Sequence, residues 1–271
     1  MFQFLNNVRI GIRVAVALLI PVAGLVAFSG YITLDRLTTL REMARLQTAA
    51  RLAPVISVLV HELQKERGTS AGFLGAKGQK FGDRLVEQRK LTDQTNAAYT
   101  QALADLDARK LGTAFSARLD TAGQMLGQLT ERRAKISDLS LPAVESAAYY
   151  TGTIARLLDL VADMAAMSTD SRMTSMITAY TSFMQAKERV GLERAMGSNA
   201  FASGKFAPAI YKRFVEVGAE QDSFLWTFNA FASDGQRQAY KATVAGREVD
   251  EVARMRKIAH DSPQTNDMGG I

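Results

Sequence analysis

The first apolar segment of the chain differs from everything that follows it. Val14–Leu34 reads VAVALLIPVAGLVAFSGYITL and contains no charged residue. A helix needs about 20 apolar residues to span the hydrocarbon core of a bilayer. A cleavable signal peptide, the alternative, has a shorter apolar region of about 7–15 residues that ends at small residues. The pattern therefore predicts a transmembrane helix over residues 14–34.

Two arginines predict how this helix is oriented. Arg9 and Arg13 are the only charged residues before it, and the cytoplasmic flanks of membrane helices are enriched in arginine and lysine. We therefore expect residues 1–13 to lie in the cytoplasm. Residues 35–50 would form a juxtamembrane helical connector, and the rest of the chain would lie outside the inner membrane, in the periplasm.

Beyond residue 34 the hydrophobic positions recur with the period of a helix, and the alternation of strands is absent. The expected breaks are 75–82, near Gly112, 137–142, 202–208, 233–235 and after His260. Segments of about 17–40 residues between breaks are typical of up-and-down bundles. The sequence predicts an all-α fold in which one transmembrane helix is followed by two adjoining up-and-down helical bundles, with a sensor domain over residues 51–260.

One arginine interrupts the apolar face of the first long helix. Arg67 follows Leu59 and Leu63 at helical spacing. A buried guanidinium is costly unless a negative group meets it. Two partners are open: an internal aspartate or glutamate, which would make the arginine structural, or an external anion.

A second copy of the surrounding sequence favours the external anion. ERGTSAGFLGAKGQKF (66–81) resembles ERAMGSNAFASGKF (193–206), and Arg194 occupies the position of Arg67. Small residues lie close to both arginines and would leave room for a compact planar anion. These supporting residues are Gly68, Ser70, Ala71, Gly197 and Ser198.

The two motifs resemble those of the NIT family, the nitrate- and nitrite-sensing domain, over about residues 50–260. The first motif rests on Glu66, Arg67, Gly68, Ser70, Ala71, Gly72, Phe73, Gly78 and Phe81, followed by Gln88, Arg89 and Asp93. The second rests on Glu188, Glu193, Arg194, Ala195, Phe201, Gly204 and Phe206.

The resemblance implies two four-helix bundles, with arginines that bind a nitrogen oxyanion between long helices. Arg67 and Arg194 match the motif positions. A third arginine from the C-terminal helix is implied, and Arg254 is the best placed, with Arg256 close behind. In the ligand-free protein these arginines would lack a negative partner, so an anion would draw the helices together.

The order of a short cytoplasmic start, one span and a sensor resembles the front half of a methyl-accepting chemotaxis receptor. A histidine kinase or a nucleotide cyclase could carry the same front half, and a structural helical membrane protein with internal ion pairs is a further alternative. We expect an extracytoplasmic module that binds nitrate or nitrite, signals across the membrane and forms a homodimer. Residues 261–271 would be a connector towards a second span.

Composition limits the remaining chemistry. The chain has no cysteine, which excludes disulfides and thiolate metal sites, and its two histidines, His61 and His260, are far apart. Since no catalytic constellation is visible, we expect no catalytic residue, no metal, no cofactor and no enzyme activity. The net charge of +6 comes from 33 Lys and Arg against 27 Asp and Glu. These charges are spread along the chain, which argues against nucleic acid as a partner and is compatible with a small anion.

Overall fold

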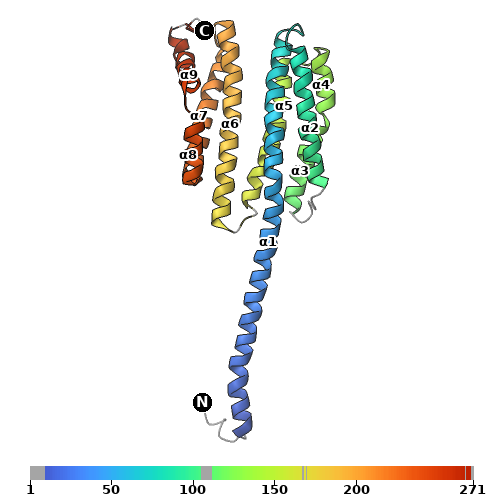
Figure 1. The fold of residues 1–271 in the computed structure, drawn as a ribbon, viewed down its shortest axis with the longest axis vertical. Coiled ribbons are helices and arrows are strands. Elements are labelled where there is room, and N and C mark those ends of the chain that lie inside the picture. The colour runs from blue at the N-terminus through green and yellow to red at the C-terminus, as the bar shows by residue number, and fades with distance from the viewer. Residues whose placement is uncertain (1–9, 105–111, 167, 169, 266, 270–271) are drawn as a thin grey trace. The chain divides into compact units, whose positions relative to one another are not determined.

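A computed structural model describes the chain except for residues 1–9, 105–111, 167, 169, 266 and 270–271. Every regular element in the described part is a helix, so the all-α prediction is confirmed (Figure 1). The helices are α1 (Ile10–Gly75), α2 (Gly82–Ala104), α3 (Thr113–Gly127), α4 (Leu129–Ser137), α5 (Ala143–Ala166), α6 (Ser171–Ser203), α7 (Pro208–Phe231), α8 (Asp234–Thr243) and α9 (Arg247–Thr265). The chain divides into two units, Met1–Arg45 and Leu46–Ile271.

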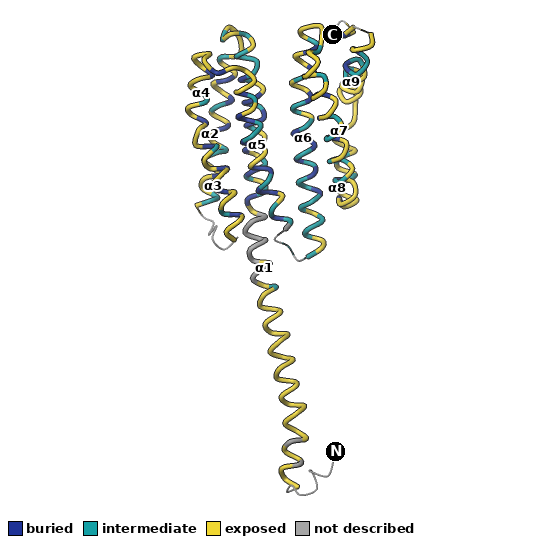
Figure 2. Tube along the Cα trace, turned by 180° about the vertical axis from the view of Figure 1, so that it is seen from behind, coloured by how far each residue is buried: buried dark blue, intermediate teal, exposed yellow. Residues whose placement is uncertain are grey.

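The first unit contains the apolar part of α1. Among the described residues, Ile10–Leu40 is long and apolar enough to cross a membrane, and no part of its most apolar window is buried. Figure 2 shows this stretch as almost wholly exposed. A helix that is apolar all round is typical of a membrane span. Arg9 lies outside the described residues and the side chain of Arg13 is not described, so the orientation stays a prediction.

The second unit begins with a bundle of α1, α2, α3, α4 and α5 around a large aliphatic core. Residues three or four apart on α1 are fully buried there, among them Ile56, Leu59 and Leu63. They pack against the buried face of α5, which includes Ile154 and Leu158. The apolar stripe expected from the sequence is therefore the part of α1 that faces this core.

The other helices of the second unit, α6 to α9, form the second bundle. Helix α6 packs against both α5 and α7, and it ends at Gly204, which has a left-handed backbone with φ of 70°. One buried cluster here consists of Ala179, Phe228 and Ala232, with Phe183 and Tyr240 packed against them. This arrangement of the helices is consistent with the two adjoining up-and-down bundles predicted from the sequence.

Some helix ends differ from those expected. The breaks between α3 and α4, between α5 and α6, and at Val244–Gly246 were not predicted. Gly246 has φ of 109°, which only glycine adopts readily. The last helix does not end after His260 but runs to Thr265. Pro263 lies in the final turn of α9, and the helix continues for two residues beyond it.

Candidate anion-binding site

Each copy of the Glu-Arg motif begins with a glutamate that pairs with an arginine on another helix of its own bundle. Glu66 on α1 is fully buried and accepts two hydrogen bonds from Arg133 of α4, at 2.7 Å from Nε and 2.9 Å from Nη2. Its Oε1 also accepts a hydrogen bond from the Tyr150 hydroxyl at 2.7 Å. Burial and the neighbouring Glu66 carboxylate raise the pKa of Tyr150, so this hydroxyl stays protonated.

The second copy repeats this arrangement. Glu193 on α6 accepts hydrogen bonds from Nε and Nη2 of Arg256 on α9, at 2.5 and 2.6 Å. Gln221 of α7 accepts a further hydrogen bond from Arg256 at 3.1 Å. The hydrogen bonds to Glu193 raise the pKa of the Arg256 guanidinium. The repeated sequence motif therefore also makes a repeated contact, from α1 to α4 and from α6 to α9.

The arginine that follows each glutamate meets different surroundings in the two copies. Arg67 is 6% exposed, and its guanidinium pairs with Glu188 of α6 at 2.5 and 3.2 Å. Its Nη1 also donates a hydrogen bond to the Thr151 hydroxyl at 2.9 Å. The expectation that the ligand-free protein leaves Arg67 without a negative partner is wrong, because α6 supplies a buried carboxylate.

Arg194, by contrast, is exposed and makes no ion pair with any residue that the structure describes. It lines a cavity of about 310 Å³ that also touches α1 and the start of α2. The complete lining is Lys65, Gly68, Thr69, Gly72, Phe81, Arg84, Gln88 and Arg194. Three of these side chains are cations and none is a carboxylate.

The positively charged side chains that line this cavity differ in whether a carboxylate lies beside them. Lys65 lies 3.0 Å from Glu62, and Gln88 donates to the same carboxylate at 2.6 Å. Burial raises the pKa of Glu62, but the hydrogen bonds from Gln88 and Lys65 outweigh it and the net shift is downward. Arg84 is exposed and, like Arg194, has no acidic partner among the described residues. Two guanidinium groups at this cavity are therefore open to an external anion.

The supporting residues expected from the sequence do not share one site. Gly68 lines the cation-lined cavity, whereas Gly197 and Ser198 line a separate apolar cavity of about 160 Å³ that Arg194 also borders. Ser70 is fully buried. Ala71 is half-buried and lines neither cavity.

Arg254, the third expected arginine, does not line either cavity at Arg194. It is exposed and pairs with Glu251 of its own helix at 2.6 and 2.8 Å. The arginine of α9 that contacts α6 is Arg256. Lys65, Thr69 and Arg84 were not predicted from the sequence. Lys65 and Thr69 share the α1 face of Gly68 and Gly72 at helical spacing, which is the signal that could have found them.

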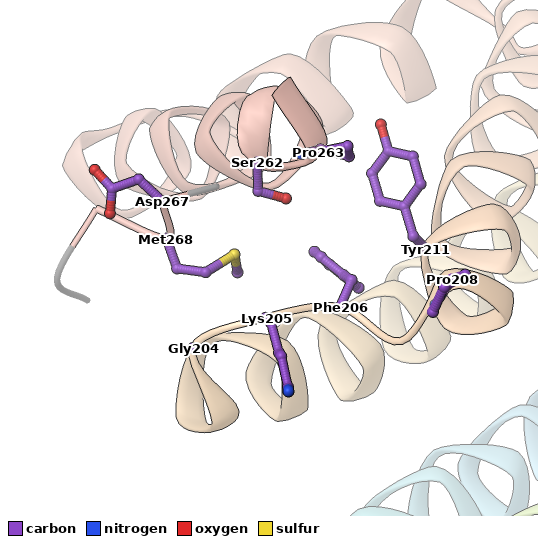
Figure 3. A pocket seen from close by; sticks show the side chains of 9 residues that line it. All are labelled: Gly204, Lys205, Phe206, Pro208, Tyr211, Ser262, Pro263, Asp267 and Met268. Carbon is purple, nitrogen blue, oxygen red and sulfur yellow. The ribbon is translucent and has the colours of Figure 1, made fainter. Parts of the chain in front are cut away.

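Another hollow, of about 260 Å³, lies where α6 ends and α7 begins, beside the C-terminal end of α9 (Figure 3). Phe206, Tyr211, Ser262 and Met268 surround it in the view, and the Lys205 side chain extends away from them. Its two charged residues, Lys205 and Asp267, have opposite sign. This hollow is less suited to an anion than the cavity at Arg194.

Known proteins share sequence and fold with this chain. Residues 58–270, most of the chain, match the family described as nitrate and nitrite sensing. The chain belongs to the nitrate- and nitrite-sensing family. Among curated proteins, a nitrate regulatory protein from Klebsiella oxytoca is 30% identical over 206 residues, which are 75% of this chain and 52% of that protein.

A solved structure of the NasR transcription antiterminator has the same fold as this member of the nitrate- and nitrite-sensing family. The TM-score is 0.76 at 27% sequence identity, and the match covers 84% of this chain and 62% of that one. The chain thus spans about half of the curated relative and less than two thirds of the solved one.

These relatives correct one prediction. They are described as a nitrate regulatory protein and a transcription antiterminator, and neither is a chemotaxis receptor, a histidine kinase or a nucleotide cyclase. The prediction of an extracytoplasmic chemotaxis receptor that signals across the membrane is therefore wrong. That prediction rested on the order of a short cytoplasmic start, one span and a sensor, an order that is not specific to receptors. Location in the inner membrane stays a prediction.

Proposed function

We propose that this protein is the nitrate- or nitrite-binding module of a regulatory protein, and that the anion binds in the cation-lined cavity at Arg194. The observation that carries the proposal is the pair of guanidinium groups, Arg84 and Arg194, that face this cavity without a carboxylate partner among the described residues. A guanidinium fork matches two oxygens of a planar oxyanion.

The size and surroundings of the cavity support a small ligand. One water occupies about 10–15 Å³ of such space, so about 310 Å³ holds a small anion together with several waters. Lys65 adds a third positive charge. The Thr69 hydroxyl and the Gln88 amide already donate to the Lys65 carbonyl and to Glu62, so the cationic groups are the donors available to an anion. A bound anion would link α6 to α1 and α2, which is how occupancy could bias the arrangement of the two bundles.

The proposed role is binding and not catalysis, and it needs no cofactor or metal. We keep the absence of direct nucleic-acid contact as a prediction for this segment only. The antiterminator relative is longer than the part matched here, and its activity belongs to that whole protein. A homodimer also stays a prediction.

We also propose that Ile10–Leu40 attaches the module to a membrane, since its exposed apolar side chains are those that a bilayer would cover.

Calorimetric titration of the purified protein with sodium nitrate and sodium nitrite, against sodium chloride at equal ionic strength, tests the anion site. We expect saturable heat for nitrate or nitrite that Arg194→Ala abolishes. Arg254→Ala is the matched control, because Arg254 is an exposed arginine already paired on its own helix, and it should leave binding unchanged. Equal binding by the wild type and Arg194→Ala would refute the site.

A further inference from the structure

Three aromatic rings from three helices meet in the second bundle. Phe183 of α6, Phe228 of α7 and Tyr240 of α8 pack against one another, with ring centroids 5.5, 5.6 and 6.2 Å apart. These are the distances of favourable tilted and edge-on aromatic pairs. The rings border a groove of about 300 Å³, which shares no lining residue with the cavity at Arg194. The complete lining is Tyr180, Phe183, Phe228, Gln236, Ala239, Tyr240, Thr243 and Val244.

Helix α8 forms one wall of this groove. Gln236, Tyr240 and Thr243 follow one another at helical spacing and therefore lie on one face of α8. No residue of α8 is buried, although this face lines the groove. The side chains of Ala239 and Thr243 are small and exposed, so they leave room between α8 and the aromatic rings.

The groove has no ionised side chain in its lining. Arg237 of α8 lies next in sequence to Gln236, but its guanidinium donates to the carbonyls of Asn229 and Ala232 and to the Asp234 carboxylate. An ion in the groove would lose water without gaining a charged partner, which is costly. The lining therefore favours a neutral ligand.

Two of the polar side chains in the lining are already hydrogen-bonded. The Tyr180 hydroxyl shares a hydrogen bond with the Ser57 hydroxyl of α1. The Thr243 hydroxyl donates to the Ala239 carbonyl at 2.8 Å. Neither group is a free partner for a ligand.

The other two polar side chains keep a free group. Gln236 Oε1 accepts hydrogen bonds from the backbone N–H and the hydroxyl of Ser233 at 2.8 and 3.1 Å, which caps α8. Gln236 Nε2 and the Tyr240 hydroxyl make no hydrogen bond to any residue that the structure describes. An amide donor and a phenol hydroxyl can together bind one hydroxyl group.

The volume of the groove sets the size of the ligand. An apolar cavity of about 150 Å³ is enough to bind benzene, so about 300 Å³ admits a molecule of one or two rings. Ligand sites of this kind are lined mainly by apolar and aromatic side chains, with a few polar groups that fix orientation. The lining described here has that composition.

We propose that this groove binds a small neutral aromatic molecule of the phenol class. The ring packs against Phe183, Phe228 and Tyr240. The ligand hydroxyl accepts a hydrogen bond from the Gln236 amide and donates one to the Tyr240 oxygen. The site is separate from the proposed anion site, and nitrate is not needed to occupy it.

Calorimetric titration of the full chain with 4-methylphenol tests the site. We expect saturable binding of one molecule per chain. Toluene has the same ring without the hydroxyl, and the lost hydrogen bonds should weaken its binding about fivefold. Sodium benzoate has the same ring with a negative charge and should not bind in the groove. Each titration compares two variants in one buffer, so that partition of the probe into lipid or detergent is equal on both sides.

Two alanines of α8 provide the matched variants. Ala239→Leu fills the groove and should abolish binding of 4-methylphenol. Ala242→Leu makes the same change on the same helix at an exposed residue that does not line the groove, and it should bind as wild type does. Both alanines are exposed, and circular dichroism checks that both variants keep their helices. Tyr240→Phe keeps the ring and should reduce the preference for 4-methylphenol over toluene.

Three results would overturn the proposal. One is the absence of 4-methylphenol binding, or equal binding by wild type and Ala239→Leu. Another is binding of tetramethylammonium chloride instead, which would make the rings a cage for a cation. The third is a melting temperature that does not respond to 4-methylphenol but rises with protein concentration in wild type and not in Ala239→Leu, which would mean that a second copy of the chain covers the groove. None of these results bears on the nitrate titration.

Discussion

Arg67 and Arg194 have similar sequence neighbours but opposite surroundings, so truncating them should have different effects. Arg67→Ala would leave the buried Glu188 carboxylate without its main partner. Breaking a buried ion pair on one side costs about 3–5 kcal/mol. Urea denaturation should therefore show a loss of that order for Arg67→Ala. The sequence alone had predicted that Arg67 lacks a negative partner in the ligand-free protein, in which case its truncation would break no ion pair.

The control for this prediction is Arg194→Ala. Arg194 is exposed and makes no ion pair within the described part of the chain, so its removal should change the free energy of unfolding by less than about 0.5 kcal/mol. Equal losses for both variants would mean that Arg67 and Glu188 do not form the pair that the structure places between α1 and α6.

His61 should make stability depend on pH near neutrality. Burial and the adjacent Lys187, whose ammonium lies 3.2 Å from Nδ1, lower the pKa of His61 below 6.5. The unfolded chain then binds a proton before the folded protein does, so stability is constant above about pH 6.5 and falls as the pH drops through the folded pKa. Denaturation midpoints measured from pH 7.5 to 5 should fall less in His61→Gln than in wild type. The same slope in both proteins would contradict this assignment.

At the scale of single residues, the sequence predicted that Arg67 and Arg194 both lack a negative partner. Among the described residues this is true of Arg194 but not of Arg67. Arg194 was identified from the repeat, and Gly68 beside it from its small size. The partner of Arg67 was missed because Glu188 lies 121 residues away in sequence, and helical spacing within α1 carries no information on which residue of α6 faces it. Arg84 was missed for the same reason.

At the scale of the helices, the glycine that ends α6 should be hard to replace. Gly204 has a left-handed backbone, with φ of 70°, and its N–H bonds the Phe201 carbonyl. An alanine with this backbone is strained, and Gly204→Ala should cost about 1 kcal/mol in urea denaturation.

Gly218 is the matched control for Gly204. It lies inside α7, where an added Cβ would meet nothing within 4 Å. Gly218→Ala should stabilise the protein by up to about 1 kcal/mol, because alanine has the higher helix propensity. A Gly204→Ala variant as stable as wild type, or as stable as Gly218→Ala, would argue against the left-handed end of α6.

Helix ends were predictable where glycine or proline marks them. The loop between α1 and α2 and the start of α7 at Pro208 were both expected. The break between α3 and α4 at Gln128 was not, because Gly127 stands alone there without a proline or a polar loop, and the break interrupts the helix for only one residue. Tertiary packing decides such a break, and periodicity does not reveal it.

At the scale of the molecule, the repeat links distant parts of the chain in a way that can be measured. The Glu66–Arg133 and Glu193–Arg256 pairs hold α1 to α4 and α6 to α9. The sequence singled out both glutamates as motif residues and named Arg256 only as the runner-up for the anion site, and it did not reveal Arg133. The Arg133 and Glu66 side chains are 12% and 0% exposed, against 34% and 9% for Arg256 and Glu193, so breaking the first pair should cost more.

Arg133→Met and Arg256→Met test this difference. Loss of Arg133 leaves the buried Glu66 carboxylate with Tyr150 and the more distant Arg89, and the loss should approach about 3–5 kcal/mol. Loss of Arg256 lets water reach Glu193 and should cost less, because solvent screens the remaining charge. Urea denaturation of the two variants should therefore rank Arg133→Met as the less stable, and the reverse order would contradict the burial seen here.

The division into two units predicts that anion binding and membrane attachment are separable. All the residues that line the cavity at Arg194 belong to Leu46–Ile271, and so do Arg67 and Glu188. Met1–Arg45 contains the whole Ile10–Leu40 stretch of α1, whose apolar side chains are exposed. A fragment that begins at Leu46 should therefore be recovered in the soluble fraction, with the nitrate-dependent melting shift of the full chain. The full chain should sediment with membranes and require detergent for release.

Recovery of the full chain in the soluble fraction would refute attachment. Loss of the nitrate response in a folded fragment would show that the first unit contributes to the site.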